Sequence, residues 1–141
     1  MAEIFDMLQA DHRTVEQLFE QYRQSSDPGV ALQICDELTV HAMLEEELVY
    51  PVLSSKVSGG MAQEARQEHQ EAKQLISQIE AGISSGADVS SLVAELEQSM
   101  QHHVQEEETE VFPKMEQQLP DLVGQMGNDY RERRPVLDTQ S

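Results

Sequence analysis

The chain contains no tryptophan, a single cysteine and few aromatic residues of any kind. Only three phenylalanines and three tyrosines occur among its 141 residues. A core must therefore be built from Leu, Val, Ile, Ala and the seven methionines, and these side chains favour helices over sheets. Cys35 has no second cysteine with which to form an internal disulfide. We interpret it as a small buried apolar residue in a cytoplasmic protein.

Basic residues are also scarce. The chain has nine Lys and Arg but 27 Asp and Glu. A formal net charge of -18 repels phosphate groups, so we expect neither nucleic acid nor an anionic membrane as a partner. No apolar run approaches the roughly 20 residues of a membrane-spanning helix. The first residues, MAEIFDML, lack the basic and apolar stretches of a signal peptide. These absences predict a cytoplasmic protein and leave a small molecule as its expected partner.

Four segments have helical periodicity and are separated by short clusters of Ser, Gly, Asp and Pro. They cover about residues 3 to 24, 30 to 57, 61 to 83, and 88 or 90 to 118. Short connections make consecutive helices antiparallel. We therefore predict an all-α fold, an antiparallel up-down-up-down four-helix bundle over residues 1 to 119. Residues 120 to 141 form a C-terminal extension, with a short helix over 120 to 134 and a frayed end from Asp138 onward.

The second and fourth segments contain the same motif at the same spacing. It consists of a histidine, a glutamate four residues later and a proline ten residues later: His41, Glu45 and Pro51, then His103, Glu107 and Pro113. Each proline removes one backbone hydrogen bond, and it either kinks its helix or ends it. The repetition predicts two similar helical hairpins related by an approximate two-fold axis. A site on that axis would be built from both hairpins.

Four of the five histidines lie on the apolar stripe of their own helix, one per helix. They are His12, His41, His69 and His103. His102 lies about 100° away from that stripe. A single core histidine is more often an ordinary hydrogen-bonded residue, but four of them together favour a metal site.

Two glutamates share the faces of these histidines. Glu45 and Glu107 each follow a core histidine by four residues, which places them on the same side of the helix. A buried carboxylate needs a cationic partner, and Lys73 is the only basic residue near these stripes. We therefore predict that a multivalent cation neutralises the two carboxylates.

The number of candidate ligands indicates two metal ions rather than one. Four imidazoles and two carboxylates exceed the needs of a closed tetrahedral zinc site. If both glutamates bridge and the ions share an oxo or hydroxo group, each ion has five ligands and an open position. Mixed imidazole and carboxylate ligation suits iron, and manganese fits the same donors.

This pattern resembles the hemerythrin-like (HHE cation-binding) family over about residues 4 to 118. The resemblance implies a non-haem di-iron centre that binds or reacts with oxygen, peroxide or nitric oxide. The ligands that it implies are His12, His41, Glu45, His69, His103 and Glu107. The chain departs from oxygen-carrying members at Lys73, where they have a second histidine, and their fourth-helix acid is an aspartate one residue later. Glu16 and Tyr50 are candidates for an extra ligand, against a surface or supporting role.

Three functions are compatible with such a site. The first is a redox protein that reacts with oxygen, peroxide or nitric oxide, and the second is a sensor or store without turnover. The third is a structural metal site in a helical interaction module. Open coordination positions favour the first two. No acid or base other than the ligands is identifiable, so whether the protein is an enzyme stays open.

The metal-free protein has an expected pH dependence. Without a cation, burial and mutual repulsion should raise the pKa values of Glu45 and Glu107, so that both take up protons near neutral pH. We expect metal-free protein to be less stable than metal-bound protein, and to lose stability as the pH rises from about 6 to 9.

Overall fold

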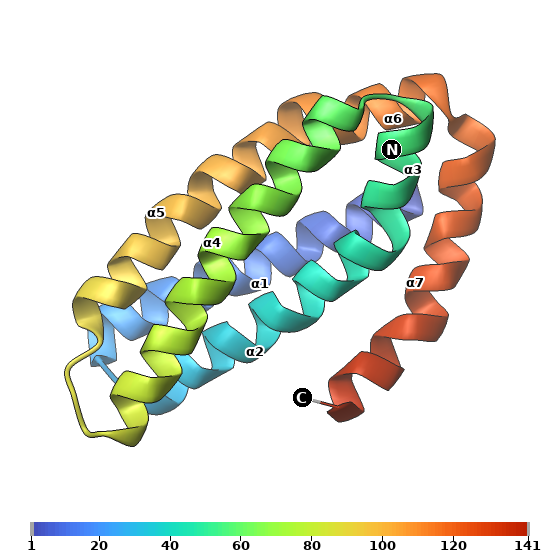
Figure 1. Ribbon diagram of the computed structural model, residues 1–141. Helices are drawn as coiled ribbons and strands as arrows, with labels where there is room; N and C mark the ends of the chain where they lie inside the picture. The colour runs from blue at the N-terminus through green and yellow to red at the C-terminus, as the bar shows by residue number, and fades with distance from the viewer. Residues whose placement is uncertain (1, 141) are drawn as a thin grey trace.

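The computed structural model describes residues 2–140, and within that range every regular element is helical. Four long helical stretches lie side by side, and consecutive ones are joined by tight connections at alternate ends (Figure 1). The stretches are α1 (Glu3–Ser25); α2 (Pro28–Leu44), η1 (Glu45–Val49) and α3 (Tyr50–Lys56); α4 (Gly59–Ser84); and α5 (Ser90–Glu106), η2 (Glu107–Val111) and α6 (Phe112–Gln118). The all-α prediction is confirmed, and each predicted stretch begins and ends within two residues of the observed one.

The connections between stretches have local causes. Ser26 adopts a left-handed backbone with φ 53°, which ends α1. The Asp27 side chain then accepts a hydrogen bond of 2.8 Å from the backbone of Gly29, and Pro28 occupies the first turn, so α2 begins at once. Ser58 caps α4 in the same way by accepting from the Met61 backbone.

The two repeated prolines do not end their helices. Pro51 lies in α3 and Pro113 in α6, and each is preceded by a five-residue π-helix, η1 or η2. In these wider turns the N–H of Tyr50 donates to the carbonyl of Glu45, five residues back, and Phe112 donates to Glu107 in the same way. The wider turn relieves the clash between a proline ring and the carbonyl four residues before it. Of the two interpretations of these prolines, termination is therefore wrong.

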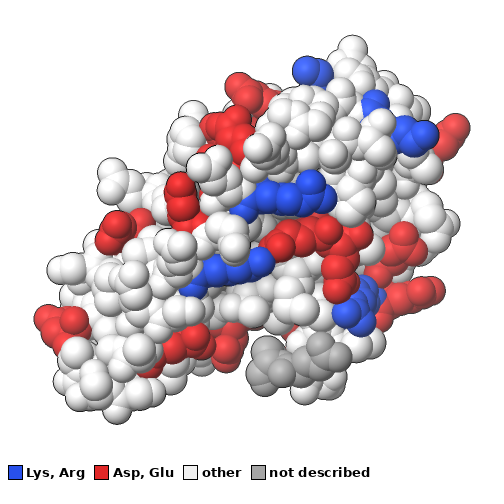
Figure 2. Space-filling view, viewed as in Figure 1, with Lys and Arg blue, Asp and Glu red and all other residues white. Residues whose placement is uncertain are grey.

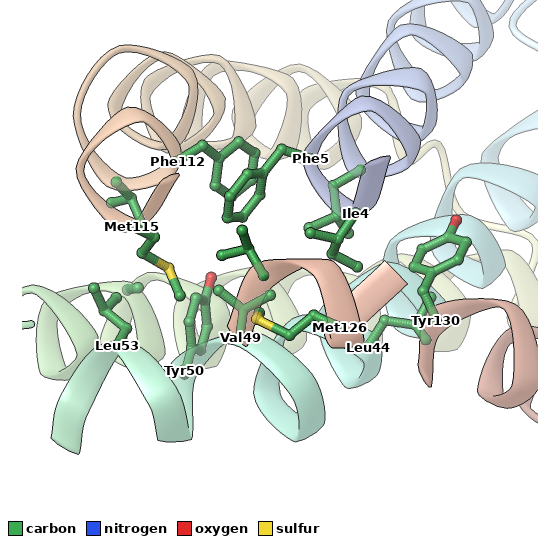
Figure 3. Packing of buried hydrophobic residues seen from close by; sticks show 14 of the residues in the cluster. Ile4, Phe5, Leu44, Val49, Tyr50, Leu53, Phe112, Met115, Met126 and Tyr130 are labelled. Carbon is green, nitrogen blue, oxygen red and sulfur yellow. The ribbon is translucent and has the colours of Figure 1, made fainter. Parts of the chain in front are cut away.

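Buried apolar side chains form two clusters, one on each side of a polar layer. Along α1, Ile4, Phe5 and Leu8 belong to the first cluster, and Val15 and Phe19 belong to the second. In the first cluster the rings of Phe5 and Phe112 stack at 4.5 Å between centroids (Figure 3). The residues between the clusters are polar, so a polar layer lies at the centre of the bundle between two hydrophobic layers.

The C-terminal residues form one long helix, α7 (Pro120–Gln140), which packs against α1, α2 and η1 (Figure 1). It is longer than the short helix expected over residues 120 to 134, and the predicted frayed end is wrong for residues 138 to 140, which are helical. Ser141 lies outside the described residues. Leu137 is 1% exposed within the first core cluster. Burying such a side chain stabilises by about 1.5–3 kcal/mol, which compensates part of the cost of about 3 kcal/mol or more for Pro135 inside the helix.

The molecular surface reflects the acidic composition. On the face shown in Figure 2, acidic side chains occur over much of the molecule, and basic side chains lie close to several of them. In the described part of the chain, no helix combines the length and the apolar character needed to cross a membrane.

Candidate metal centre

The six predicted site residues come together in the polar layer at the centre of the bundle. Each is between 0% and 4% exposed. The histidines come from α1, α2, α4 and α5, and each glutamate is the first residue of a π-helix: His12, His41, His69, His103, Glu45 and Glu107. The prediction that His103 faces inward and His102 outward is confirmed, because the His102 side chain is 66% exposed.

The imidazoles meet in two pairs, one from each hairpin. His12 Nε2 lies 3.1 Å from His41 Nε2, and His69 Nε2 lies 3.2 Å from His103 Nε2. A neutral imidazole carries only one N–H. Where that proton sits on Nδ1, two Nε2 lone pairs face each other, and only a proton or a metal ion between or beside them makes the arrangement favourable.

The surroundings of the Nδ1 atoms favour a proton on Nδ1. Every Nδ1 faces a carboxylate, at distances of 2.7 to 3.3 Å: His12 with Glu108, His41 with Asp11, His69 with Glu46, and His103 with Glu68. An N–H on Nδ1 satisfies the carboxylate and leaves Nε2 free to bind a cation. Such carboxylate–histidine contacts orient the rings of metal-binding histidines.

The two glutamates connect the histidine pairs. Glu107 Oε1 lies 3.3 Å from His12 Nε2, and its Oε2 lies 3.2 Å from His103 Nε2. Glu45 Oε1 lies 3.2 Å from His41 Nε2 and 3.1 Å from His69 Nε2. Each carboxylate therefore reaches both pairs, as a bridging ligand must.

Two carboxylate oxygens test whether the cluster fits a metal. Among the described residues, the buried side-chain atoms without a hydrogen-bond partner are Glu45 Oε2 and Glu107 Oε1. A buried oxygen without a donor is unfavourable by about 1–3 kcal/mol. A cation at this position would satisfy both oxygens. Within the buried cluster, nitrogen and oxygen ligand atoms that lie within 4.8 Å of one another form two groups that could hold a metal ion. These groups are His12, His41, Glu45 and Glu107, and then Glu45, His69 and His103.

The charge state of the metal-free cluster differs from the one predicted. Burial lowers the pKa of His41, but Glu45 and Asp11 outweigh burial and raise it to about 10. Burial likewise lowers the pKa values of His69 and His103, and neighbouring carboxylates reverse this effect and raise both. Burial raises the pKa of Glu45, yet the His41 imidazolium holds it well below its usual range. The expectation that Glu45 takes up a proton near neutral pH is therefore wrong, because the histidines supply the positive charge.

Tyr50 enters the second half of the cluster. Its single O–H can donate to Glu107 Oε2 at 2.9 Å or to Glu45 Oε1 at 3.2 Å, and the hydroxyl oxygen also lies 3.0 Å from His69 Nε2. Burial and the two carboxylates raise its pKa well above the usual range. The corresponding residue of the other hairpin is Phe112, whose ring lies 6.2 Å from that of His12 and offers no hydroxyl.

Other sequence candidates lie away from the cluster. Glu16 is about half exposed and pairs with Arg13 at 2.6 Å, so it does not reach the histidines. Lys73 is also exposed and pairs with Glu46 at 2.9 Å. Cys35 is buried, and burial raises the pKa of its thiol to about 12, as expected for an unreactive core residue.

A mainly apolar cavity of about 260 Å³ adjoins the cluster between α2 and α4. His41 and His69 form part of its wall, together with Ala72 and Ile76. The small side chain of Ala72 leaves room beside His69 in this cavity. A small apolar molecule entering it would reach one histidine of each pair.

The sequence alone does not identify the four carboxylates that face Nδ1 as site residues. These outer carboxylates are Asp11, Glu46, Glu68 and Glu108. Glu46 and Glu108 each lie within one to five residues of a site residue in an acidic run, which is more typical of a solvated face. Asp11 directly precedes His12, and Glu68 directly precedes His69, yet each serves the histidine of another helix. Only the packing of helices brings these pairs together.

Comparison with known proteins places these residues in a family. A family model described as the hemerythrin HHE cation binding domain matches residues 3–132. A protein of Nostoc sp. named DNA nickase is 36% identical over 113 residues, which cover 77% of this chain and 32% of that protein. An uncharacterized hemerythrin-like protein of Schizosaccharomyces pombe is 27% identical over 149 residues, 100% of this chain and 73% of that protein. No solved structure matches the chain.

Proposed function

This chain belongs to the hemerythrin HHE cation-binding domain family, and we propose that its buried cluster binds two iron ions. The observation that carries the proposal is the facing of two Nε2 pairs, 3.1 and 3.2 Å apart, with a carboxylate reaching both pairs. Imidazole and carboxylate donors suit iron, and manganese is the alternative metal.

The two ions would have different ligands. His12, His41, Glu45 and Glu107 would hold the first. His69, His103 and Glu45 would hold the second, with Glu107 Oε2 near His103 and Tyr50 as a further oxygen ligand beside them. The tyrosine would take the place of the nitrogen ligand that Lys73 does not provide. This assignment rests on geometry, since Tyr50 touches every other member of the second group.

We further propose that the loaded centre binds and reacts with oxygen, peroxide or nitric oxide. A pair of iron ions supplies electrons and open coordination positions for such ligands. The side chains of this protein hold the centre, exclude bulk water and admit the ligand through the cavity beside His41 and His69. Asp11, Glu46, Glu68 and Glu108 keep the Nδ1 protons in place, so that Nε2 stays available.

A sensor or store is the second candidate function. It is favoured by the contact of α7 with Asp11, because a change at the metal site could then alter the position of a helix outside the bundle. We do not extend DNA nicking to this chain, because the chain spans 32% of the relative with that name. Its net charge of -18 also disfavours binding to DNA.

Metal analysis of protein produced with ample iron tests the proposal. Wild-type protein should contain close to two irons per chain, and its ferric form should absorb in the near ultraviolet. His103→Ala should remove at least one iron and most of that absorption. His102→Ala is the matched control, because His102 is the exposed neighbour and should leave both unchanged. One zinc per chain, or bleaching by His102→Ala alone, would contradict the proposal.

A further inference from the structure

One outer carboxylate is held from outside the four long stretches. Asp11 lies on α1, and its Oδ2 is 3.3 Å from His41 Nδ1. The Tyr130 hydroxyl donates to the same Oδ2 at 2.7 Å, and Arg134 donates to Oδ1 at 2.7 Å. Tyr130 and Arg134 both belong to α7, so a continuous set of hydrogen bonds runs from α7 through Asp11 to His41.

The other three outer carboxylates receive their basic partners from the bundle itself. Arg13 of α1 pairs with Glu108 and Lys73 of α4 pairs with Glu46, whereas the exposed His102 of α5 lies 3.6 Å from Glu68 and closer, at 3.0 Å, to Glu106. Among these four contacts, only the one to Asp11 depends on α7. His41 is therefore the histidine whose orientation a displacement of α7 would change.

Other contacts hold Tyr130 and Arg134 of α7 in place beside Asp11. Arg134 also donates to Tyr130 at 2.7 Å and to Glu37 of α2 at 3.0 Å, so it joins α7 to both helices of the first hairpin. Tyr130 is 7% exposed and belongs to the first core cluster, which fixes its ring while its hydroxyl reaches Asp11. Displacement of α7 would leave the buried Asp11 without two of its donors.

We propose that Asp11 is a positioning residue for His41, and that α7, through Tyr130 and Arg134, couples its docking to metal binding. The inference rests on the proposed function, because it concerns the same metal site. Coupling of two equilibria is reciprocal. Docked α7 raises the affinity for metal, and bound metal holds α7 in place, so α7 is the element through which the state of the site reaches the surface.

Iron affinity, measured by competition with a chelator, tests the first half of the coupling. Arg134→Gln should weaken iron binding several-fold, which is less than the about tenfold to a hundredfold typical of losing a direct partner of a metal-binding histidine, here Asp11. Arg134→Lys should restore part of the affinity, because lysine can still donate to Asp11. Arg131→Gln is the matched control, since Arg131 also joins α7 to α1, through Glu3, without touching Asp11.

Hydrogen exchange of the α7 amides tests the second half. In wild-type protein, adding iron should slow exchange along α7, whereas in Arg134→Gln it should have a much smaller effect. Tyr130→Phe provides a second variant that keeps the ring and Arg134, in case Arg134→Gln does not fold. It should weaken iron binding several-fold and reduce the effect of iron on exchange.

Three outcomes would overturn the inference alone. These are unchanged iron affinity in Arg134→Gln, an equal loss in Arg131→Gln, and α7 exchange that does not respond to iron in wild-type protein. Wild-type protein that binds no iron would instead overturn the proposed function on which the inference rests.

Discussion

Tyr50 and Phe112 make the two halves of the centre chemically different although the chain repeats itself. They occupy the same place in the two motifs, nine residues after His41 and His103. Both are fully buried, but only Tyr50 brings a hydroxyl into the cluster. The two ions would therefore differ in ligands, and one half would carry a phenol where the other carries a hydrocarbon ring.

Replacing Tyr50 tests whether this hydroxyl is a ligand. If the phenol oxygen binds ferric iron, the ferric protein should have a visible absorption band, because phenolate transfers charge to the metal. Tyr50→Phe gives the first motif the same residue that the second has at Phe112, and it should abolish that band while the near-ultraviolet absorption persists. Absorption spectra of the iron-loaded proteins provide the measurement.

Tyr22→Phe serves as the control for that substitution. Tyr22 is also buried, but its hydroxyl lies 3.3 Å from Ser90 and away from the cluster. It should keep the visible band. A visible band that survives in Tyr50→Phe would mean that Tyr50 only donates a hydrogen bond to the bridging glutamates.

At the scale of helices, the π-helical segments explain why regular helical spacing does not place Tyr50 in the core, although the sequence names it as a candidate ligand. In a regular α-helix, a residue nine positions after His41 lies about 180° away from it and points out of the core. The extra residue in η1 turns Tyr50 back toward the centre. His41 precedes η1 and Glu45 is its first residue, so the regular 100° spacing is sufficient to place both.

The contribution of α7 had a detectable signal, in contrast to the outer carboxylates. Val123, Met126, Tyr130 and Leu137 are all buried and follow the spacing of one helical face. The helix predicted over residues 120 to 134 ends just before Pro135, whereas α7 continues past this proline. The pairing of Asp11 with His41 leaves no such pattern, because the two residues belong to different helices and meet only when the bundle packs.

Filling the cavity between α2 and α4 tests its role as the entry path. Ala72→Leu adds volume inside the cavity and should slow the reaction of the ferrous protein with oxygen several-fold, while two irons remain bound. Stopped-flow absorbance measures this rate. Ala81→Leu, on the exposed face of the same helix, should have no effect. Equal rates in Ala72→Leu and wild type would place the entry path elsewhere.

For the whole molecule, the central cluster holds two carboxylates between hydrophobic layers in a chain with net charge -18. Metal binding to the folded state stabilises it by mass action, by about 2.7 kcal/mol when free iron exceeds its dissociation constant a hundredfold. For a chain of this size, that corresponds to a rise of about 5 to 10 °C in the melting temperature. Equal melting temperatures with and without iron would contradict a buried metal site.

The last prediction concerns how metal-free protein responds to pH. The folded-state pKa of His41 is about 10, and those of His69 and His103 are also raised, whereas an unfolded histidine titrates near 6.5. A group with a raised pKa stabilises the folded state fully below the unfolded pKa, and this contribution is lost as the pH rises through the folded pKa. Metal-free protein should therefore lose stability as the pH rises from about 6.5 toward 10, by roughly 1 kcal/mol per pH unit from His41, and His69 and His103 should change stability in the same direction. The sequence predicts the same loss of stability with rising pH, but the histidines rather than protonated glutamates cause it.

Iron-loaded protein should lack this slope, because the metal replaces the protons on Nε2. Denaturant unfolding of both forms across this range measures the effect, and metal-free His102→Ala should keep the slope. A metal-free stability that stays constant or rises between pH 6.5 and 10 would show that the imidazoles are not paired with the buried carboxylates.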